Sequence, residues 1–384
     1  MSALAFGRKA GTTEAYIAMD YIRDTLKKEN MKIEIDPFLW VSIWALYILM
    51  FVVLILIMSF VIIISFFTLA GTAFGYITLF VSFYFLVYYL RSISIYKNFD
   101  LLNPVQKGHV SHNITTRIAS NKYKREKPVI IFCAHFDSVS ISYSERIINS
   151  MIIIFVFYVF ILFPINLTMD VHIIFKIFNI ILLFGFLFFF LSIRAKNKSK
   201  GSVDDASGTA ILIELSKLFH NNPLNNIDLI FLWTGAEEMG LFGSKTFCYR
   251  NFKNLNNEYN LDKSYVINID MVGSYIGLID QIGMFKKTKF NKSLNNIFEE
   301  IARKKEIPLR KEIKSISFMS DHTVFQSYAK KYKRELQICW FYSGEDSKFI
   351  HSSKDTPDKC IPENLNGCIE LCYYTLKKLD KSLE

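Results

Sequence analysis

The sequence predicts an α/β fold in which a mixed, mostly parallel sheet is sandwiched by helices, together with about four transmembrane helices in two hairpins. Three observations carry this prediction. Short apolar runs of strand length alternate with amphipathic runs of helix length, which is the pattern of an α/β sandwich. Several of the apolar runs end close to Asp, Glu or His, and two much longer apolar stretches interrupt the alternation.

The first predicted element is an amphipathic helix over 13–29, where apolar residues such as Ala15, Ile22 and Leu26 share one helical face. The other soluble elements follow from runs of alternating or continuous apolar residues. They are strands at 32–36, 111–118, 128–133, 227–233 and 265–269 and helices at 209–219 and 291–305. Strands that alternate with helices in this way predict crossover connections and a sheet that is parallel at its centre.

The first long apolar stretch runs from Pro37 to Leu90 without Asp, Glu, Lys, Arg or His. Because a helix crosses a bilayer in roughly 20 residues, this stretch has the length of two spanning helices. A turn near 69–72 would join them, and a second helix pair is predicted at 147–165 and 173–193. Buried core helices are the alternative, which the length of the first stretch disfavours.

The chain has 384 residues, enough for one large domain or two small ones. It is 51% hydrophobic and holds 36 Phe, an excess concentrated in the long apolar stretches. The six cysteines show no zinc-knuckle pairing, so free thiols in a reducing compartment are expected. A formal net charge of +10 fits attraction to an anionic lipid bilayer, and the basic residues form no nucleic-acid-binding module.

Basic residues flank the apolar stretches on one side only. Those of the first 36 residues are Arg8, Lys9, Arg23, Lys27, Lys28 and Lys32, and the two hairpin tips carry none. The positive-inside rule therefore predicts a multi-pass integral membrane protein with a cytoplasmic N-terminus and cytoplasmic soluble segments. The first 36 residues also lack a signal-peptide pattern. Trp40 and Trp44, at the start of the first predicted helix, are expected at the membrane interface.

Six short motifs rich in His, Asp, Glu and Ser follow one another along the chain. They are Ala134–Ser138, Val203–Gly208, Ala236–Glu238, Asn268–Gly273, Ser320–His322 and His351–Thr356. Three of them follow predicted apolar strands, at the carboxyl ends where open α/β sheets place their sites. Each motif alone has a plain structural interpretation, such as a helix N-cap at Asp204 and Asp205. Only the ordered set indicates a single site.

If the motifs converge, one cleft would hold four carboxylates, those of Asp204, Glu237, Glu238 and Asp270. Four carboxylates cannot share a dry site unless some are protonated or cations neutralise them. Two divalent cations would balance their charge and leave His135 and His351 as neutral ligands. The residue types therefore favour a dinuclear metal site over a lone acid pair.

The ordered set resembles the M28 family of zinc aminopeptidases, and the resemblance covers the soluble sequence from about residue 11 to His351 and beyond. It implies a di-zinc metallopeptidase that acts on peptide substrates and releases their N-terminal residues, and the two predicted hairpins would anchor it in the membrane. The implied metal ligands are His135 and Asp270 for one Zn²⁺, Glu238 and His351 for the other, and Asp204 as the bridge between the two. Glu237 would be the general base that activates a water between the metals, and Asp137 would hold a ligand in place.

The resemblance also predicts how the chain is divided. An M28-like catalytic domain would be split into 1–37, 92–146 and 194–384, with transmembrane hairpins at 38–91 and 147–193. The second hairpin departs from the family pattern, because it separates Asp137 from Asp204, where the family has a short connection.

Other interpretations stay open at this point. A glutaminyl-cyclase-like or carboxypeptidase activity could use the same fold, and manganese or cobalt could occupy the same ligands. A catalytically inactive membrane scaffold would predict lost ligands, whereas all five ligand positions and Glu237 are present. A transporter would need a polar path that the predicted helices lack. The oligomeric state and the physiological peptide are not predicted.

Overall fold

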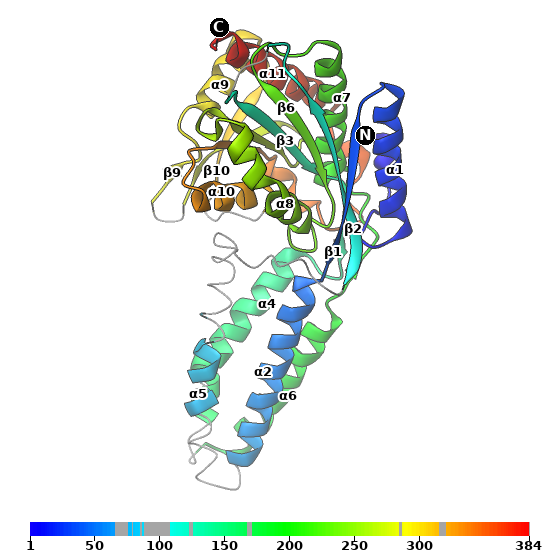
Figure 1. Cartoon of the computed structure of the whole chain (residues 1–384). Helices are drawn as coiled ribbons and strands as arrows, with labels where there is room; N and C mark the ends of the chain where they lie inside the picture. Colours follow the sequence, from blue (N-terminus) through cyan, green and yellow to red (C-terminus); the bar gives the residue numbers. More distant parts are fainter. Residues whose placement is uncertain are drawn as a thin grey trace. The chain divides into compact units, whose positions relative to one another are not determined.

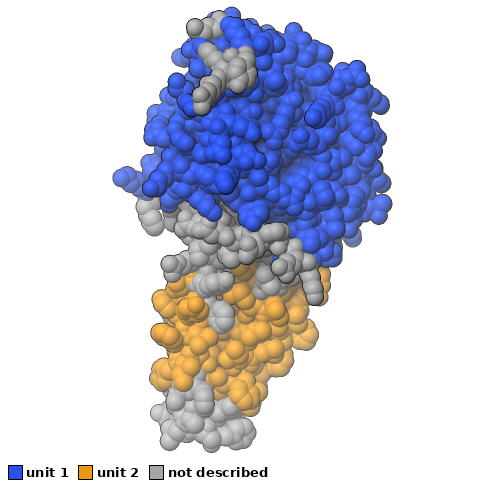
Figure 2. Space-filling view, viewed as in Figure 1, with its two compact units in different colours: residues 1–41, 96–140, 196–384 blue, residues 42–95, 141–195 orange. Residues whose placement is uncertain are grey.

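The computed structural model describes residues 1–65, 76–78, 80–84, 87, 108–122, 126–166, 171–283, 286–314 and 320–383. The chain forms two compact units, coloured separately in Figure 2. Unit 1 consists of 1–41, 96–140 and 196–384, and unit 2 of 42–95 and 141–195. The sequence-based division, with its boundaries at 37/38, 91/92, 146/147 and 193/194, stays a prediction.

Unit 1 is built on one large mixed sheet (Figure 1). Its strands are β1 (Ile33–Trp40), β2 (His109–Ile118), β3 (Val129–His135), β6 (Asp228–Thr234), β7 (Tyr265–Ile269), β8 (Ile276–Ile282), β9 (Thr288–Lys289), β10 (Leu309–Lys314) and β11 (Gln337–Phe341). They are ordered β1-β2-β6-β3-β7-β11-β8-β10, with β9 beside β8. A separate short ribbon pairs β4 (Ser140–Ile141) with β5 (Ala195–Lys196).

The centre of the sheet is parallel, as the sequence predicts. β3 pairs in parallel with both β6 and β7, and β11 pairs in parallel with β7. Every residue of β3 and β6 is buried, which explains why their sequences are continuously apolar rather than alternating. The antiparallel partners lie toward the edges, where β1 pairs with β2 and β2 with β6.

Helices cover both faces of this sheet. They are α1 (Thr13–Lys28), α7 (Ser207–Asn221), α8 (Phe242–Glu258), α9 (Leu294–Lys304), α10 (His322–Lys331) and α11 (Pro362–Lys381). Because side chains alternate across a strand, Ile130 and Phe132 of β3 pack in the core that holds α1, α7, α9 and α11. Ile131 and Cys133 pack on the opposite face, in the core that holds α8 and α10. The result is a sandwich with two separate cores, one on each face of the sheet.

The predicted elements of unit 1 agree with the observed ones to within three residues at each end, except at the end of the first strand. β1 continues to Trp40, past the predicted strand end at Asp36. Trp40 pairs in register with His109 and is 3% exposed, with the two rings 4.9 Å apart. The expectation that Trp40 opens the first apolar helix is therefore wrong, because Trp40 is the last residue of β1 and is buried in unit 1. Its place at the membrane interface stays a prediction.

Unit 2 consists of apolar helices, which run side by side in Figure 1. They are α2 (Ile43–Ser65), α4 (Glu145–Phe157), the π-helical turn η2 (Tyr158–Leu162), α5 (Phe163–Asn166) and α6 (Ile173–Ser192). Aromatic side chains dominate their shared core: Phe51 stacks on Phe190 with 4.6 Å between ring centroids, and Phe155 meets Phe186 edge-on at 5.1 Å.

Two helices of unit 2 are long and apolar enough to cross a membrane, at Arg146–Asn166 and Ile173–Ser192. A shorter apolar helix spans Tyr47–Ile63. The predicted turn near 69–72 lies outside the described residues, as does most of the helix predicted to follow it. Of the four transmembrane helices predicted, the described chain therefore supports two.

Candidate metal centre

Three adjacent parallel strands deliver their last residues to one edge of the sheet. β3 ends at His135, β6 ends three residues before Glu237, and β7 ends directly before Asp270. The parallel register of β6, β3 and β7 aligns these ends, so residues far apart in the sequence meet there. The remaining predicted ligands come from loops: Asp204 from η3 (Ser202–Ala206), before α7, and His351 from the turn after η5 (Gly344–Lys348).

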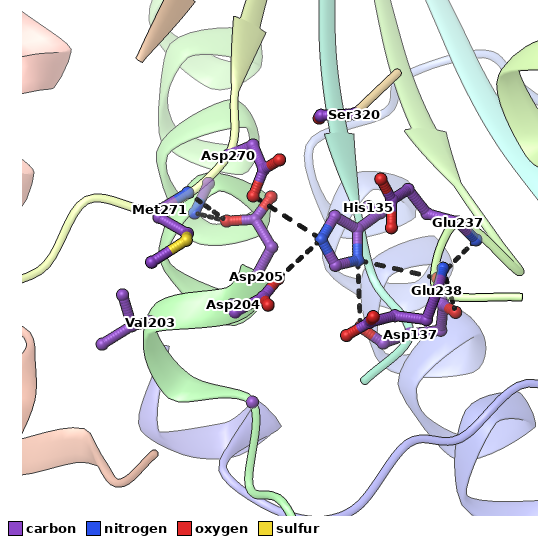
Figure 3. Close-up of polar contacts among 12 residues, drawn as sticks. His135, Asp137, Val203, Asp204, Asp205, Glu237, Glu238, Asp270, Met271 and Ser320 are labelled. Carbon is purple, nitrogen blue, oxygen red and sulfur yellow. Dashed lines mark hydrogen bonds and ion pairs between the residues drawn. The ribbon is translucent and has the colours of Figure 1, made fainter. Parts of the chain in front are cut away.

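The predicted ligands form two groups that share Asp204. In the first group, His135 Nε2 lies 2.9 Å from Asp204 Oδ1 and 3.8 Å from Asp270 Oδ1 (Figure 3). In the second, His351 Nε2 lies 2.9 Å from Glu238 Oε2 and 3.4 Å from Asp204 Oδ2. Within each group one ligand atom per residue lies within 4.8 Å of the others. Asp204 thus presents one carboxylate oxygen to each group.

The electrostatics of this cluster are those of a site that needs cations. Burial raises the pKa of Glu238 to about 7 and, with the charges of Asp321 and Asp270 adding to it, raises the pKa of Glu237 well above its usual value. Burial disfavours the imidazolium of His135, but the charge of Glu237 and bonds to Asp137, Asp204 and Asp270 outweigh it, so its pKa is raised. The raised pKa of His135 shows that the surrounding carboxylates favour a positive charge at this place.

The donor set fits divalent cations of the zinc type. Each group combines one imidazole nitrogen with two carboxylates, the ligand types that Zn²⁺ accepts. Glu238 Oε1 is buried and, among the described residues, has no hydrogen-bond partner. An orphaned buried carboxylate oxygen costs free energy that coordination would recover. The first group is nearly closed to solvent, with Asp204 only 6% and His135 only 2% exposed. The second group is more open, because the His351 side chain is 18% exposed.

Asp137 supports both halves of the centre. Its carboxylate accepts hydrogen bonds from the backbone N–H groups of Glu237, at 3.1 Å, and Glu238, at 3.3 Å. Its backbone carbonyl lies 3.1 Å from His135 Nδ1. With a proton on Nδ1, His135 donates to that carbonyl and keeps the Nε2 lone pair for the site. The structure thus places Asp137 where it orients a predicted ligand and the loop of the predicted base.

Two further aspartates hold the ligand loops, and sequence reasoning assigned neither to the site. Asp355 accepts from the backbone N–H groups of Val203, at 2.7 Å, and Asp204, at 3.2 Å. Asp205 accepts from Gly208 N at 2.8 Å and from Met271 N at 3.3 Å, so it ties the loop of Asp204 to the residue after Asp270. Asp355 belongs to the same short motif as His351, which is the one feature of the sequence that could have drawn attention to it.

Three residues at the centre have a left-handed backbone conformation. Ala236, Met271 and His351 have φ angles of 52°, 81° and 53°, in the left-handed region that costs free energy for residues other than glycine. The first two adjoin Glu237 and Asp270, and His351 is itself a predicted ligand. Surrounding contacts must hold these conformations, and the hydrogen bond from Met271 N to Asp205 is one of them.

The motif Ser320–His322 lies close to the centre but is engaged with the protein itself. Ser320 accepts from Asn268 Nδ2 at 2.8 Å, and the Asp321 carboxylate accepts from the hydroxyl of Thr234. His322 is fully buried and stacks on Trp340 with 4.4 Å between ring centroids. These contacts give the motif a part in the core beneath the strand ends.

A parallel-centred α/β sandwich with two carboxylate–imidazole groups at its strand ends is the architecture of a metal-dependent hydrolase. The chain belongs to peptidase family M28, whose family model matches residues 113–376.

Solved structures share the fold at low sequence identity. An aminopeptidase from Aneurinibacillus sp. strain AM-1 superposes with a TM-score of 0.55 at 14% identity, covering 98% of this chain and 91% of the other. A glutaminyl cyclase from an Acidobacteriales bacterium superposes with a TM-score of 0.54 at 13% identity, covering 99% and 91%. Because peptidase and cyclase share the architecture equally well, the fold alone does not separate the two activities.

A curated relative in Pyrenophora tritici-repentis, described as a probable zinc metalloprotease, is 37% identical over 75 residues. The matched region covers 19% of this chain and 16% of the relative.

Proposed function

We propose that this protein is a membrane-anchored di-zinc aminopeptidase. The observation that carries the proposal is the pair of ligand groups that share Asp204, one completed by His135 and Asp270 and the other by Glu238 and His351. Two cations bridged by one carboxylate form the arrangement that two-metal hydrolases use. Membership of peptidase family M28 supports peptide bonds as the substrate.

In this proposal zinc, when bound by these five residues, supplies a Lewis acid and lowers the pKa of water. Glu237 is the general base. Neither ligand group in the described chain includes it, and its backbone N–H is held by Asp137 beside Glu238. Its raised pKa, which burial causes first, suits a carboxylate that accepts a proton from water and returns it to the leaving amine.

The charge of the centre does not decide between the two ends of a peptide, because two divalent cations would balance the carboxylates of Asp204, Glu237, Glu238 and Asp270. Release of N-terminal residues is supported instead by the aminopeptidase whose fold matches 98% of this chain. We therefore assign the substrate as a peptide with a free N-terminus.

The membrane part of the proposal rests on unit 2. Its two long apolar helices expose apolar side chains, among them Ile153 at 68%, Ile181 at 64% and Phe188 at 70%. Soluble proteins rarely expose a continuous apolar surface of this kind, and lipid would cover it. We propose that both hairpins span the bilayer, giving four helices, with the catalytic unit and the N-terminus in the cytoplasm. Cysteine accessibility at residue 14 on intact and permeabilised cells would test the orientation.

The activity is tested with the detergent-purified protein and a panel of aminoacyl-fluorogenic substrates, each paired with its N-acetylated form. Hydrolysis of free but not acetylated substrates is expected, with loss of activity on chelation and recovery on adding zinc. Equal hydrolysis of both forms would contradict cleavage from the N-terminus. Inactivity toward the whole panel would contradict the aminopeptidase proposal.

A second candidate is glutaminyl cyclisation, because a glutaminyl cyclase has the same fold. The presence of ligands for two metals, rather than one, disfavours it. Peptides with N-terminal glutamine separate the two functions: the aminopeptidase releases free glutamine, and a cyclase forms pyroglutamate with loss of ammonia and leaves the peptide intact.

A further inference from the structure

Arg8 is a fully buried arginine that lies outside all six motifs. Its guanidinium donates to backbone carbonyls, and those that it meets in the described chain come from three separate segments. Nε donates to Phe136 O at 2.7 Å, Nη1 to Lys200 O at 2.7 Å and Nη2 to Gly201 O at 2.9 Å, while Nη1 also meets the carbonyls of Leu4 and Phe6. A lysine has a single ammonium and could not reach so many acceptors in one plane.

The segments that Arg8 joins are the two ends of the chain's second apolar insertion. The chain leaves unit 1 after Ser140 and returns at Lys196. Phe136 lies between His135 and Asp137, on the outgoing side, and Lys200 and Gly201 precede Asp204, on the returning side. Other bonds also join these two sides, among them Lys198 N to Ser140 Oγ at 2.9 Å and Thr209 Oγ1 to His135 O at 2.9 Å. Arg8 adds a charged link inside unit 1 that reaches the residue after His135 and the loop before Asp204 at once.

The backbone around Arg8 strengthens this clasp, by which we mean Arg8, Ser138 and Gly201. Arg8 N donates to Ser138 Oγ at 3.0 Å, and Ser138 N donates back to Arg8 O at 3.2 Å. Gly201 has φ of +53°, and a Cβ there would lie 2.7 Å from Arg8 Nη2 and 2.4 Å from Ser138 Cβ. The position therefore requires glycine both for its backbone and for room beside the guanidinium.

Arg8 is also the buried cation behind the carboxylates of the centre. Burial lowers its pKa to about 10, and the charges of Asp137, Asp355, Asp205 and Asp204 oppose that shift. It thus remains charged at neutral pH.

We propose that Arg8 is a positioning residue for the metal centre: it joins the loop of His135 and Asp137 to the loop of Asp204 and thereby sets metal affinity. This inference rests on the proposed metal site. Arg8 is distant in sequence from His135 and Asp204, and its guanidinium bonds are to backbone carbonyls of other residues. The inference is that this residue nevertheless determines how well the two ligand groups are pre-formed.

The test measures the zinc dissociation constant by chelator competition on the full-length protein, together with the thermal midpoint of the metal-free form. The variants are Arg8→Met, which keeps the length of the side chain and removes its donors, and Arg8→Lys, which keeps the charge. Arg23→Met is the matched control, because Arg23 is partly exposed on α1 and its ion pairs within the described residues are with its neighbours Asp20 and Asp24.

Arg8→Met is expected to weaken zinc binding about 10- to 100-fold, the usual effect of removing support behind metal ligands, with partial rescue in Arg8→Lys and no change in Arg23→Met. The Co²⁺-substituted protein should show an altered absorption spectrum. An unchanged dissociation constant and spectrum in a destabilised Arg8→Met would overturn the inference, because Arg8 would then be structural only. Absence of metal in the wild type would instead overturn the proposed function.

If Arg8→Met does not fold, Ser138→Ala provides the test of the inference. It removes the bond from Arg8 N and the weaker link to Ser199 O and leaves the guanidinium in place. Zinc binding several-fold weaker at an unchanged thermal midpoint supports the clasp, and unchanged zinc binding overturns it.

Discussion

The carboxylate of Asp137 accepts a hydrogen bond from the backbone N–H of Glu237 at 3.1 Å. This contact joins the loop after β3 to the loop after β6, and a second bond from Glu238 N to the other oxygen completes it. A proposed metal ligand and the proposed base are therefore aligned by one side chain.

Asp137→Asn should weaken this alignment, because an amide can accept one of the two backbone N–H groups and turns its own NH₂ toward the other. We expect zinc affinity and kcat/KM to fall about 10- to 100-fold. Zinc titration and steady-state kinetics would measure both. Asp24→Asn, at an exposed position on α1, is the control. Unchanged values for both quantities in Asp137→Asn would show that the contact plays no part in the site.

The shared position of Asp204 predicts unequal effects of removing ligands. His351→Ala leaves the group of His135, Asp204 and Asp270 complete, so it should retain about one zinc per chain. Asp204→Ala removes a ligand from both groups and should retain little of either. Metal content after gel filtration, measured by mass spectrometry, tests the difference. Equal losses in the two variants would contradict a bridging carboxylate.

Because His322 is buried, we expect the free energy of unfolding to fall at acidic pH. Burial lowers its pKa from 6.5 to about 3, between the rings of Phe290 and Trp340. At pH values between these two pKa values, His322 binds a proton in the unfolded chain but not in the folded chain. Its titration therefore destabilises the fold as the pH falls. His322→Phe removes it. From pH 6.5 to 5 the wild type should lose about 1.6 kcal/mol more of its unfolding free energy than the variant.

Denaturant unfolding of both metal-free proteins at the two pH values measures that difference, and the titrations of the centre cancel in the comparison. Parallel losses in wild type and variant would mean that His322 is not held neutral in the fold.

The apolar surface of α6 predicts how the chain meets the bilayer. Ile181 is 64% exposed near the middle of that helix, and an arginine there should cost about 2.5–3.5 kcal/mol of insertion free energy. We expect Ile181→Arg to shift protein out of the carbonate-resistant membrane fraction. Leu218→Arg, on the exposed side of α7 in unit 1, should not. Full extraction of the wild type by carbonate would contradict spanning helices.

The sequence is sufficient for the elements whose causes are local. The strands that end at His135, Thr234 and Ile269 are mostly apolar because both of their faces are covered. The polar residues after them mark the edge where the site forms. M28-like motifs in order then indicate the ligands. Contacts between distant segments leave no such pattern. Arg8 looks like one more basic residue of the N-terminal segment, although it is buried and cannot contribute to a basic surface.

Other features escape sequence reasoning for related reasons. Trp40 lies between an alternating strand and a long apolar stretch, so the sequence permits either a strand or a helix at this residue. Its pairing with His109 shows that it belongs to the strand. The left-handed conformations of Ala236, Met271 and His351 occur at residues with no preference for them, so tertiary contacts impose them. Asp355 acts through backbone N–H groups of residues far earlier in the chain, a relation that only the fold creates.

The most direct test of the proposed mechanism is Glu237→Gln, measured for zinc content and for aminoacyl hydrolysis on the same preparation. The substitution removes a proton acceptor and leaves both ligand groups intact. We predict about two zinc ions per chain in wild type and variant alike, with kcat about 10²- to 10⁴-fold lower in the variant. Full activity in Glu237→Gln, with zinc retained, would contradict a general base at this position.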